Sequence, residues 1–327
     1  MKILITGGAG YIGSTISNYF LDLGYCVTII DNLSTGYKFL IPSKARFIKG
    51  DISNKKILAS LFKSNTFDFV IHLAGFTNIE ESLTKPKKYI INNYYKSKVF
   101  INECFKFGIK KFIFSSTAAV YANSKTGFVS EKSLIKIKNP YAGSKFLLEK
   151  FLKKKSEKEK GKYIILRYFN VAGADFRTRS GSVYQDSLIK NILNSIASKN
   201  KIFNIYGNDY DTNDGTAVRD FIHIMDLAEI HLHAIKYLLI GKKNLILNCG
   251  YNFGYSVNQV LEIAQKTFKT KLFIRYLPRR KGDLPCVISI NKKLIKYLKW
   301  RPRYQNLTCI LKSAFSWQKR IRNLYLK

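Results

Sequence analysis

The chain has 327 residues, which is enough for one large domain or two modest ones with a sizeable buried core. Its composition is 46% hydrophobic and 14% aromatic, which excludes an intrinsically disordered chain. The formal net charge of +35 would suit a nucleic-acid or acidic-membrane partner. However, the lysines are spread along the whole chain, and no helix-turn-helix, RNA-binding or zinc-finger pattern accompanies them. We therefore interpret the charge as a compositional bias and expect no nucleic-acid and no membrane partner.

Three features bear on the compartment. The densest apolar run, near residues 67–76, is interrupted by His72 and is far shorter than the ~20 residues of a membrane span. The chain starts directly with a strand-like segment, without the pattern of a signal peptide. The five cysteines show no CxxC spacing, which is typical of reduced thiols. We expect a cytoplasmic protein.

Residues 2–6 form a short apolar run that leads into the glycine-rich sequence GGAGYIG, from Gly7 to Gly13. A helical pattern follows over residues 11–23. A strand, a glycine turn and a helix in this order predict a dinucleotide-binding unit. The first glycine allows the turn, Gly10 lets the backbone approach the pyrophosphate, and the last lets the helix pack on the strand. The phosphates would lie at the helix N-terminus.

The next predicted strand, residues 25–30, is followed by Asp31. An acidic residue about 20 residues beyond the glycines is expected to bind ribose hydroxyls and to favour NAD over NADP. The alternative interpretation is an ordinary turn carboxylate that precedes Asn32.

Strands and helices continue to alternate up to residue 170. Further strands are predicted over residues 46–49, 68–73, 110–115 and 163–169, and a long helix over 89–107. This alternation predicts an α/β fold, a Rossmann-like, doubly wound parallel sheet. Ligands of such sheets bind beyond the carboxyl ends of the strands. Several candidate residues follow strand ends: Asp51, which could meet the adenine, the small residues Ala74 and Gly75 with Phe76, and Thr117 and Asn170.

The segment Asn139-Pro140-Tyr141-Ala142-Gly143-Ser144-Lys145 predicts the start of a helix, with asparagine as its cap and proline in its first turn. Tyr141 and Lys145 then share a face. A nearby cation lowers the pKa of a phenol, so Tyr141 could take a proton from an alcohol while hydride leaves the same carbon. The alternative is a packed tyrosine beside a solvated lysine.

Beyond residue 170 the pattern loosens. We expect residues 1–170 to form the dinucleotide-binding domain and residues 171–327 a smaller mixed α/β substrate domain, with some segments crossing back. Helices are predicted over 187–199 and 225–239. The arginines Arg219, Arg279 and Arg280, with Asp283, are candidates for a phosphate clamp; the alternative is surface charge. The histidines at 231 and 233 point to different helix faces, so we expect no metal site.

These motifs resemble the UDP-glucose 4-epimerases (UDP-galactose 4-epimerases), extended short-chain dehydrogenases/reductases. The resemblance covers nearly the whole chain and rests on GGAGYIGS, DNLSTG from Asp31, SSTAAVY from Ser115, YAGSK from Tyr141 and LRYFNVAGA from Leu166. These motifs are shared with dehydratases and decarboxylases of the superfamily. The block YGNDYDTNDGTAVRDFIHIMDLA and the sequence RRKGDLP from Arg279 are more specific.

The resemblance implies a tightly held NAD and interconversion of UDP-glucose and UDP-galactose through a 4-keto sugar. Tyr141 would take the proton of the sugar 4-hydroxyl, with Thr117 on the same oxygen. Lys145 would hold the nicotinamide ribose and lower the Tyr141 pKa, helped by the positive ring of NAD. The implied cofactor-binding residues are Gly7, Gly10, Tyr11, Ile12, Gly13, Asp31, Asn32, Asp51, Ile52, Ala74, Gly75, Phe76, Asn93, Ser115, Tyr141, Lys145 and Tyr168. The implied substrate-binding residues are Thr117, Tyr141, Phe169, Asn170, Leu188, Tyr206, Arg219, Arg280, Asp283 and Val287.

Three positions depart from the family pattern. Thr77 stands where many members have a lysine that contacts the cofactor, and Val171 where many have proline. Val287 occupies a position that lies against the sugar C2 substituent, where a bulky tyrosine would crowd an N-acetyl group. A wider pocket would admit UDP-N-acetylglucosamine and UDP-N-acetylgalactosamine. The alternative is that Val287 merely packs in a shifted loop.

Two helices, 89–107 and 141–152, are apolar over more than one stripe, which predicts a homodimer. Two other interpretations of the sequence remain: an epimerase or decarboxylase that acts on another UDP-sugar such as a uronate, or an NAD-binding sensor or scaffold. A sensor would be expected to lose the tyrosine or the lysine, and both are present.

Overall fold

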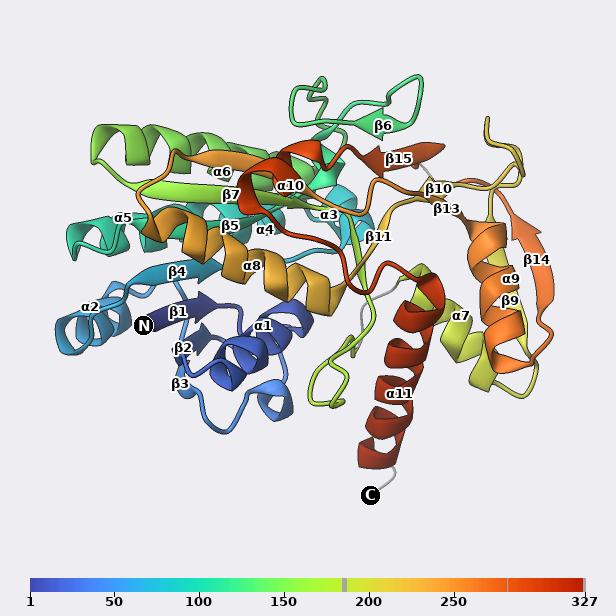
Figure 1. The fold of residues 1–327 in the computed structure, drawn as a ribbon, viewed down its shortest axis with the longest axis horizontal. Helices are drawn as coiled ribbons and strands as arrows, with labels where there is room; N and C mark the ends of the chain where they lie inside the picture. Colours follow the sequence, from blue (N-terminus) through green and yellow to red (C-terminus); the bar gives the residue numbers. More distant parts are fainter. Residues whose placement is uncertain (184–186, 281, 326–327) are drawn as a thin grey trace.

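The computed structural model describes residues 1–183, 187–280 and 282–325. Within them, the centre is a seven-stranded sheet in the order β12-β7-β5-β4-β1-β2-β3 (Figure 1). Every pairing in it is parallel, which confirms the predicted doubly wound sheet. Its strands are β1 (Lys2–Thr6), β2 (Cys26–Asp31), β3 (Arg46–Lys49), β4 (Phe69–His72), β5 (Lys111–Thr117), β7 (Lys162–Tyr168) and β12 (Leu245–Cys249).

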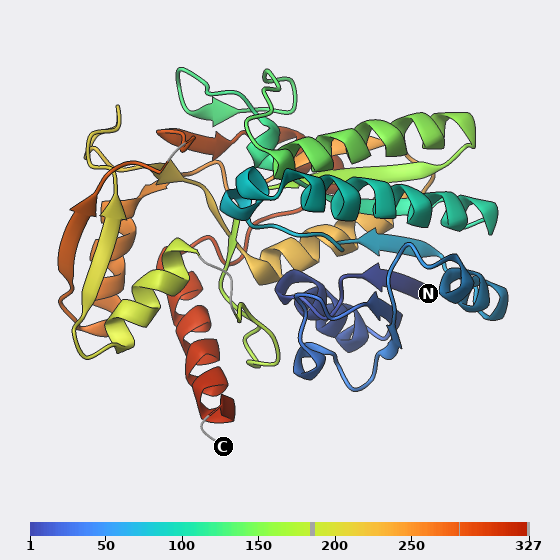
Figure 2. The same ribbon diagram turned by 180° about the vertical axis from the view of Figure 1, so that it is seen from behind.

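Both faces of this sheet are covered by helices, because its strands are apolar at successive positions. In β1, Ile3 and Ile5 pack on one face with α1 (Tyr11–Asp22) and α8 (Ile224–Leu239). Leu4 points to the other face, where it meets residues of α2 (Lys55–Ser64), α5 (Ser97–Lys106) and α6 (Pro140–Lys158). Figure 1 shows α1 and α8 in front of the sheet, and Figure 2 shows α5 and α6 side by side on the opposite face.

The remaining strands form small sheets beside the large one. A four-stranded sheet has the order β13-β10-β15-β6, and two pairs, β11-β8 and β14-β9, complete the set. These strands are β6 (Phe128–Val129), β8 (Asn170–Ala172), β9 (Ile202–Tyr206), β10 (Val218–Arg219), β11 (Phe221–His223), β13 (Tyr255–Ser256), β14 (Phe273–Leu277) and β15 (Cys286–Ser289). The other helices are α3 (Ile79–Thr84), α4 (Pro86–Tyr89), α7 (Leu188–Ala197), α9 (Val257–Phe268), α10 (Lys292–Leu298) and α11 (Leu307–Tyr325), with one-turn 3₁₀ segments at Lys38–Leu40 and Ala118–Val120.

The two halves of the chain interleave. β12 and α8 follow residue 171 in sequence but complete the large sheet and its helical cover. In the other direction, β6 joins the small sheet by pairing with β15. Segments from each side of residue 170 thus take part in the sheets of the other side.

The helix predicted over 89–107 differs from the observed structure. Residues Ile90–Lys96 form a π-helical segment between α4 and α5. Inside this segment Asn93 is buried, and its side-chain amide forms hydrogen bonds with Phe76 and Ser144. π-helical turns occur frequently near functional sites. None of the described helices is both long and apolar enough to cross a membrane.

Candidate functional site

A cavity of about 1240 Å³ lies beyond the carboxyl ends of the parallel strands, where this fold binds its ligands. Its lining comes from both halves of the chain. All of the site residues predicted from sequence lie in the described part, and all except Asn93 and Arg279 line this cavity.

The glycine turn after β1 is shaped by backbone contacts. Gly7 has φ +72°, and a Cβ there would lie 2.7 Å from the backbone nitrogen of Ala74. A Cβ on Gly13 would lie 2.2 Å from the carbonyl oxygen of Gly7, so the helix can start this close only with glycine. Gly10 is different, because its Cβ would make only an ordinary contact at 3.4 Å. Packing does not require glycine at this position, whereas a ligand that approaches the backbone does.

Asp31 is tied to the glycine turn. One carboxylate oxygen accepts the Ala9 N–H at 3.0 Å, and the other accepts the Leu33 N–H at 2.8 Å. Burial raises the pKa of this carboxyl, and the two N–H donors oppose the shift. Asp31 is therefore held at the rim of the cavity in a fixed orientation.

The acid–base pair lies at the start of α6, as predicted. Asn139 caps the helix, since its side-chain oxygen accepts the Ala142 N–H at 2.8 Å, and Pro140 occupies the first turn. Tyr141 and Lys145 both line the cavity. Lys145 is 2% exposed, and its Nζ donates to the Ser115 carbonyl oxygen at 3.0 Å.

The expected direction of the Tyr141 pKa is wrong for the protein alone. Burial raises the pKa of the Tyr141 phenol, and a hydrogen bond with the Thr117 side chain is the opposing influence. Burial also lowers the pKa of Lys145 to about 8, so its amine loses its proton in the weakly alkaline range. The four-residue spacing alone therefore does not lower the pKa of the phenol, whereas a further positive charge beside it would do so.

Two arginines line the same cavity. The Arg219 guanidinium lies 3.3 Å from Asp283, and Arg280 stacks over the Tyr206 ring at 4.3 Å, with Glu80 at 3.6 Å. Arg279 is not in the lining. It pairs instead with Asp209 at 2.6 Å and stacks on Tyr210, so only one of the two adjacent arginines faces the cavity.

Asn93 lies behind the cavity wall. Its side-chain oxygen accepts the Phe76 N–H at 2.8 Å, and its nitrogen donates to the Phe76 carbonyl at 2.9 Å and to Ser144 at 3.2 Å. It fixes the loop after β4 and has no free polar atom to offer a ligand.

Sequence reasoning missed several lining residues. Gly36 ends the DNLSTG motif, and this motif is the sequence signal that could have identified it. A Cβ there would lie 2.8 Å from the Ala9 side chain, so Gly36 closely approaches the glycine turn. Glu80 and Lys138 carry no motif, and only the fold brings them to the cavity.

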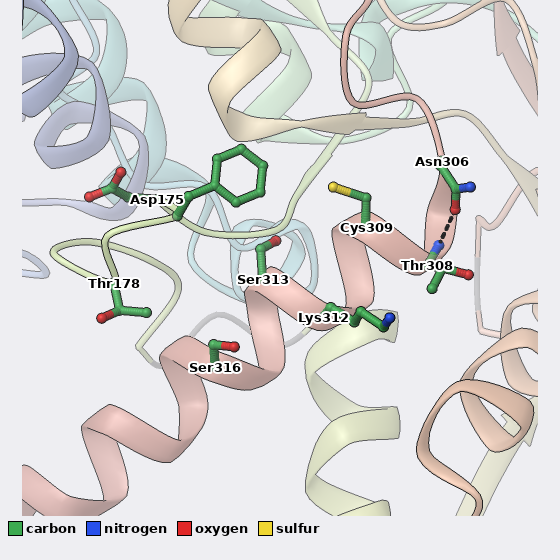
Figure 3. A pocket seen from close by; sticks show the side chains of 9 residues that line it. Asp175, Thr178, Asn306, Thr308, Cys309, Lys312, Ser313 and Ser316 are labelled. Carbon is green, nitrogen blue, oxygen red and sulfur yellow. Dashed lines mark hydrogen bonds between the residues drawn. The ribbon is translucent and has the colours of Figure 1, made fainter.

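A second hollow of about 490 Å³ lies between the loop after β8 and the start of α11 (Figure 3). Asp175 in its wall is already paired with Arg179, and Ser313 is hydrogen-bonded to His223. Its lining residues contain neither a tyrosine–lysine pair nor a glycine turn. The larger cavity is therefore the candidate active site. No group of three or more His, Cys, Asp or Glu side chains in the described residues could hold a metal ion.

Comparisons with known proteins agree on one family. Residues 3–250 match the model of the NAD dependent epimerase/dehydratase family. The chain is 37% identical over 322 residues to the UDP-glucose 4-epimerase of Lacticaseibacillus casei, covering 97% of this chain and 96% of that protein.

Solved structures give the same result. The UDP-glucose 4-epimerase of Bifidobacterium longum, in complex with NAD⁺ and UDP, is 31% identical with a TM-score of 0.92, and the match covers 99% of each chain. The UDP-Glc/GlcNAc 4-epimerase of Campylobacter jejuni is 39% identical with a TM-score of 0.85, over 98% of this chain and 99% of that one.

Proposed function

The chain belongs to the NAD dependent epimerase/dehydratase family, and on this basis we propose that it is an NAD-dependent UDP-glucose 4-epimerase, which interconverts UDP-glucose and UDP-galactose. One observation carries the proposal. Tyr141, Lys145 and Thr117 open into the same cavity as the glycine turn and the two arginines, so one pocket can hold a dinucleotide and a sugar nucleotide end to end.

The residues present suit NAD. The first N–H groups of a helix have no partner within the helix, and those of Tyr11, Ile12 and Gly13 at the start of α1 would bind the pyrophosphate. Asp31 would accept the ribose hydroxyls. When bound, NAD supplies the hydride acceptor and donor for the sugar C4, and its positive ring supplies the charge that the phenol needs.

The acid–base work falls to Tyr141. Its phenolic oxygen would take the proton of the sugar 4-hydroxyl and return it from the same position when C4 is reduced on its other face. The Thr117 hydroxyl, which already lowers the pKa of this phenol, would bond the same sugar oxygen. Lys145 would bind the nicotinamide ribose from its position under Ser115.

The diphosphate is assigned to Arg219 and Arg280. Each guanidinium has a carboxylate neighbour, Asp283 and Glu80 respectively, on the exposed side of the cavity. Phosphate oxygens bond guanidinium bidentately and carry more charge than one carboxylate, so the substrate can compete for both.

We further propose that the enzyme accepts N-acetylated UDP-sugars. Val287 lines the cavity on β15, beside Arg219 in the parallel pairing of β10 and β15. The valine side chain is smaller than a tyrosine side chain by several atoms, which leaves room for an N-acetyl group in this part of the cavity. The Campylobacter jejuni relative, named for both glucose and N-acetylglucosamine substrates, supports this extension.

A homodimer is proposed on exposed apolar residues. Ile91 and Tyr95 on the π-helical segment are 51% and 55% exposed, and Leu147 on α6 is 40% exposed. The two segments pack against each other, so a second copy could cover both.

The direct test is incubation of the purified protein with UDP-galactose and analysis of the sugar released by hydrolysis. We expect glucose from the wild-type protein. The matched control, Tyr141→Phe, should keep its fold and bound NAD but lose about 10²- to 10⁴-fold in turnover. Near-normal turnover in that variant would overturn the assigned mechanism.

A further inference from the structure

Helix α6 holds the end of β5 at two consecutive residues. Lys145 donates to the Ser115 carbonyl at 3.0 Å, and one helical turn further on Glu149 accepts a hydrogen bond from the Ser116 hydroxyl at 2.5 Å. Both contacts are buried, and the next residue of β5 is Thr117. The strand end that carries Thr117 is thus fixed to the helix that carries Tyr141.

Glu149 also forms a buried ion pair with Arg167 of β7. The guanidinium donates from Nε at 2.9 Å and from Nη2 at 2.6 Å to the two carboxylate oxygens. Glu149 and Arg167 are 1% and 3% exposed. Desolvation offsets much of the attraction in such a pair, so stability alone is a weak reason for it.

The remaining nitrogen of the Arg167 guanidinium extends the network along the cavity wall. Its Nη1 donates to the Tyr121 hydroxyl at 2.9 Å, and Tyr121 in turn donates to the Asn248 side chain at 2.6 Å. Asn248 donates to the Val129 carbonyl at 3.0 Å. Ser116 and Tyr121 both line the cavity, whereas Glu149 and Arg167 lie behind it. The network therefore joins α6, β5, β7, β12 and β6 behind the wall of the cavity that Ser116 and Tyr121 line.

We propose that Glu149 and Arg167 are positioning residues, which set the location of Thr117 relative to Tyr141 without touching the substrate. The inference rests on the proposed function. A displacement of about 1 Å between catalytic groups costs on the order of 100-fold in rate. In the proposed function the sugar nucleotide is bound by Arg219 and Arg280 and NAD by the glycine turn, and the hydrogen bonds of the network reach none of these. Loss of the network should therefore lower kcat and leave KM and bound NAD nearly unchanged.

The decisive variant is the double substitution Glu149→Met/Arg167→Met. Glu149→Met alone leaves a buried, unpaired guanidinium and should destabilise strongly, whereas removing both charges should restore the midpoint of unfolding toward wild type. We expect the double variant to keep kcat about 10- to 100-fold below wild type, with KM within about 3-fold. Recovery of kcat together with stability would show that the pair is only structural, and would overturn the inference.

A milder variant and a control complete the experiment. Ser116→Ala removes the hydrogen bond between β5 and Glu149 but leaves the Glu149–Arg167 ion pair intact. We therefore expect a lowered kcat in this variant even if the double variant does not fold. Tyr251→Phe removes a buried bond to Asp226 outside the cavity lining and should lower stability without lowering kcat. Unchanged kcat in Ser116→Ala, or an equal kcat loss in Tyr251→Phe, would contradict the inference. An inactive wild-type protein would overturn the proposed function and this inference with it.

Discussion

The Nζ of Lys145 lies 3.0 Å from the carbonyl oxygen of Ser115, with the lysine 2% exposed. This contact places an amine under the end of β5, on the floor of the cavity. Because burial lowers the pKa of Lys145 to about 8 from 10.5, the folded protein binds this proton more weakly than the unfolded chain.

This lowered pKa makes folding stability depend on pH. Between about pH 8 and 10.5 the unfolded chain holds more protons on this lysine, so folding stability increases with pH. Below pH 8 the folded protein carries the full cost of a buried cation. That cost is at most about 3.5 kcal/mol, at about 1.4 kcal/mol per pKa unit.

We predict that Lys145→Met, although inactive, is at least as stable as the wild-type protein at pH 7 when both are free of cofactor. The advantage should disappear toward pH 10, as measured by urea unfolding at both pH values. Lys153→Met, at an exposed site on the same helix, is the control and should change little. A Lys145→Met variant that is less stable at pH 7, by an amount independent of pH, would refute the account of burial.

Cofactor preference gives a second prediction. Asp31 should exclude the 2′-phosphate of NADP, so the cofactor released on denaturation should be mainly NAD. Asp31→Ser should narrow the preference, measured as the ratio of NAD to NADP bound from an equal mixture. Asp51→Asn removes a carboxylate from the same cavity, where it pairs with Lys96, and should leave the ratio unchanged. A wild-type preference for NADP would contradict the role of Asp31.

The features that could be predicted from the sequence are those that short segments of the chain determine. The glycine turn, the cap at Asn139 and the strand beginning at Lys2 are set by short segments, and the structure places them where predicted. The return of β12 to the large sheet is not local, because nothing in residues 245–249 indicates which sheet they join.

Two predictions, the continuous helix and the lowered Tyr141 pKa, were wrong because both depend on contacts that the local sequence does not determine. The sequence predicted one continuous helix over residues 89–107, because the apolar pattern does not show that residues 90–96 form a π-helical segment in which Asn93 bonds Phe76. The Tyr141 pKa depends on burial and on where the Lys145 amine points, neither of which the four-residue spacing determines.

The third prediction concerns substrate range. Val287→Tyr should lower kcat/KM for the N-acetylated UDP-sugars by about 10- to 100-fold, since the larger side chain would occupy the space proposed for the N-acetyl group, and forcing extra atoms into a filled site costs roughly 1–3 kcal/mol. Activity on UDP-galactose should change little. Cys286→Ala, at the neighbouring position of β15 that faces Gly127, is the control. If the native protein ignores N-acetylated substrates, or the tyrosine variant handles them equally well, Val287 is not the gate.

The fourth prediction is a homodimer in light scattering at micromolar concentration. Tyr95→Lys should produce a monomer, because it places a charge on an apolar side chain that is 55% exposed in the single chain. Leu134→Lys, at a leucine that is 74% exposed elsewhere, should remain dimeric. A wild-type monomer would disprove the proposal.

The central claim is that hydride leaves C4 of the sugar and returns to the same carbon, while Tyr141 moves only the hydroxyl proton. Incubation of the wild-type protein with UDP-galactose deuterated at C4, in ordinary water, tests it most directly. The account predicts UDP-glucose that retains the deuterium at C4, and no such product from Tyr141→Phe in the same time. Product that has lost the label to solvent, or no UDP-glucose at all, would contradict it.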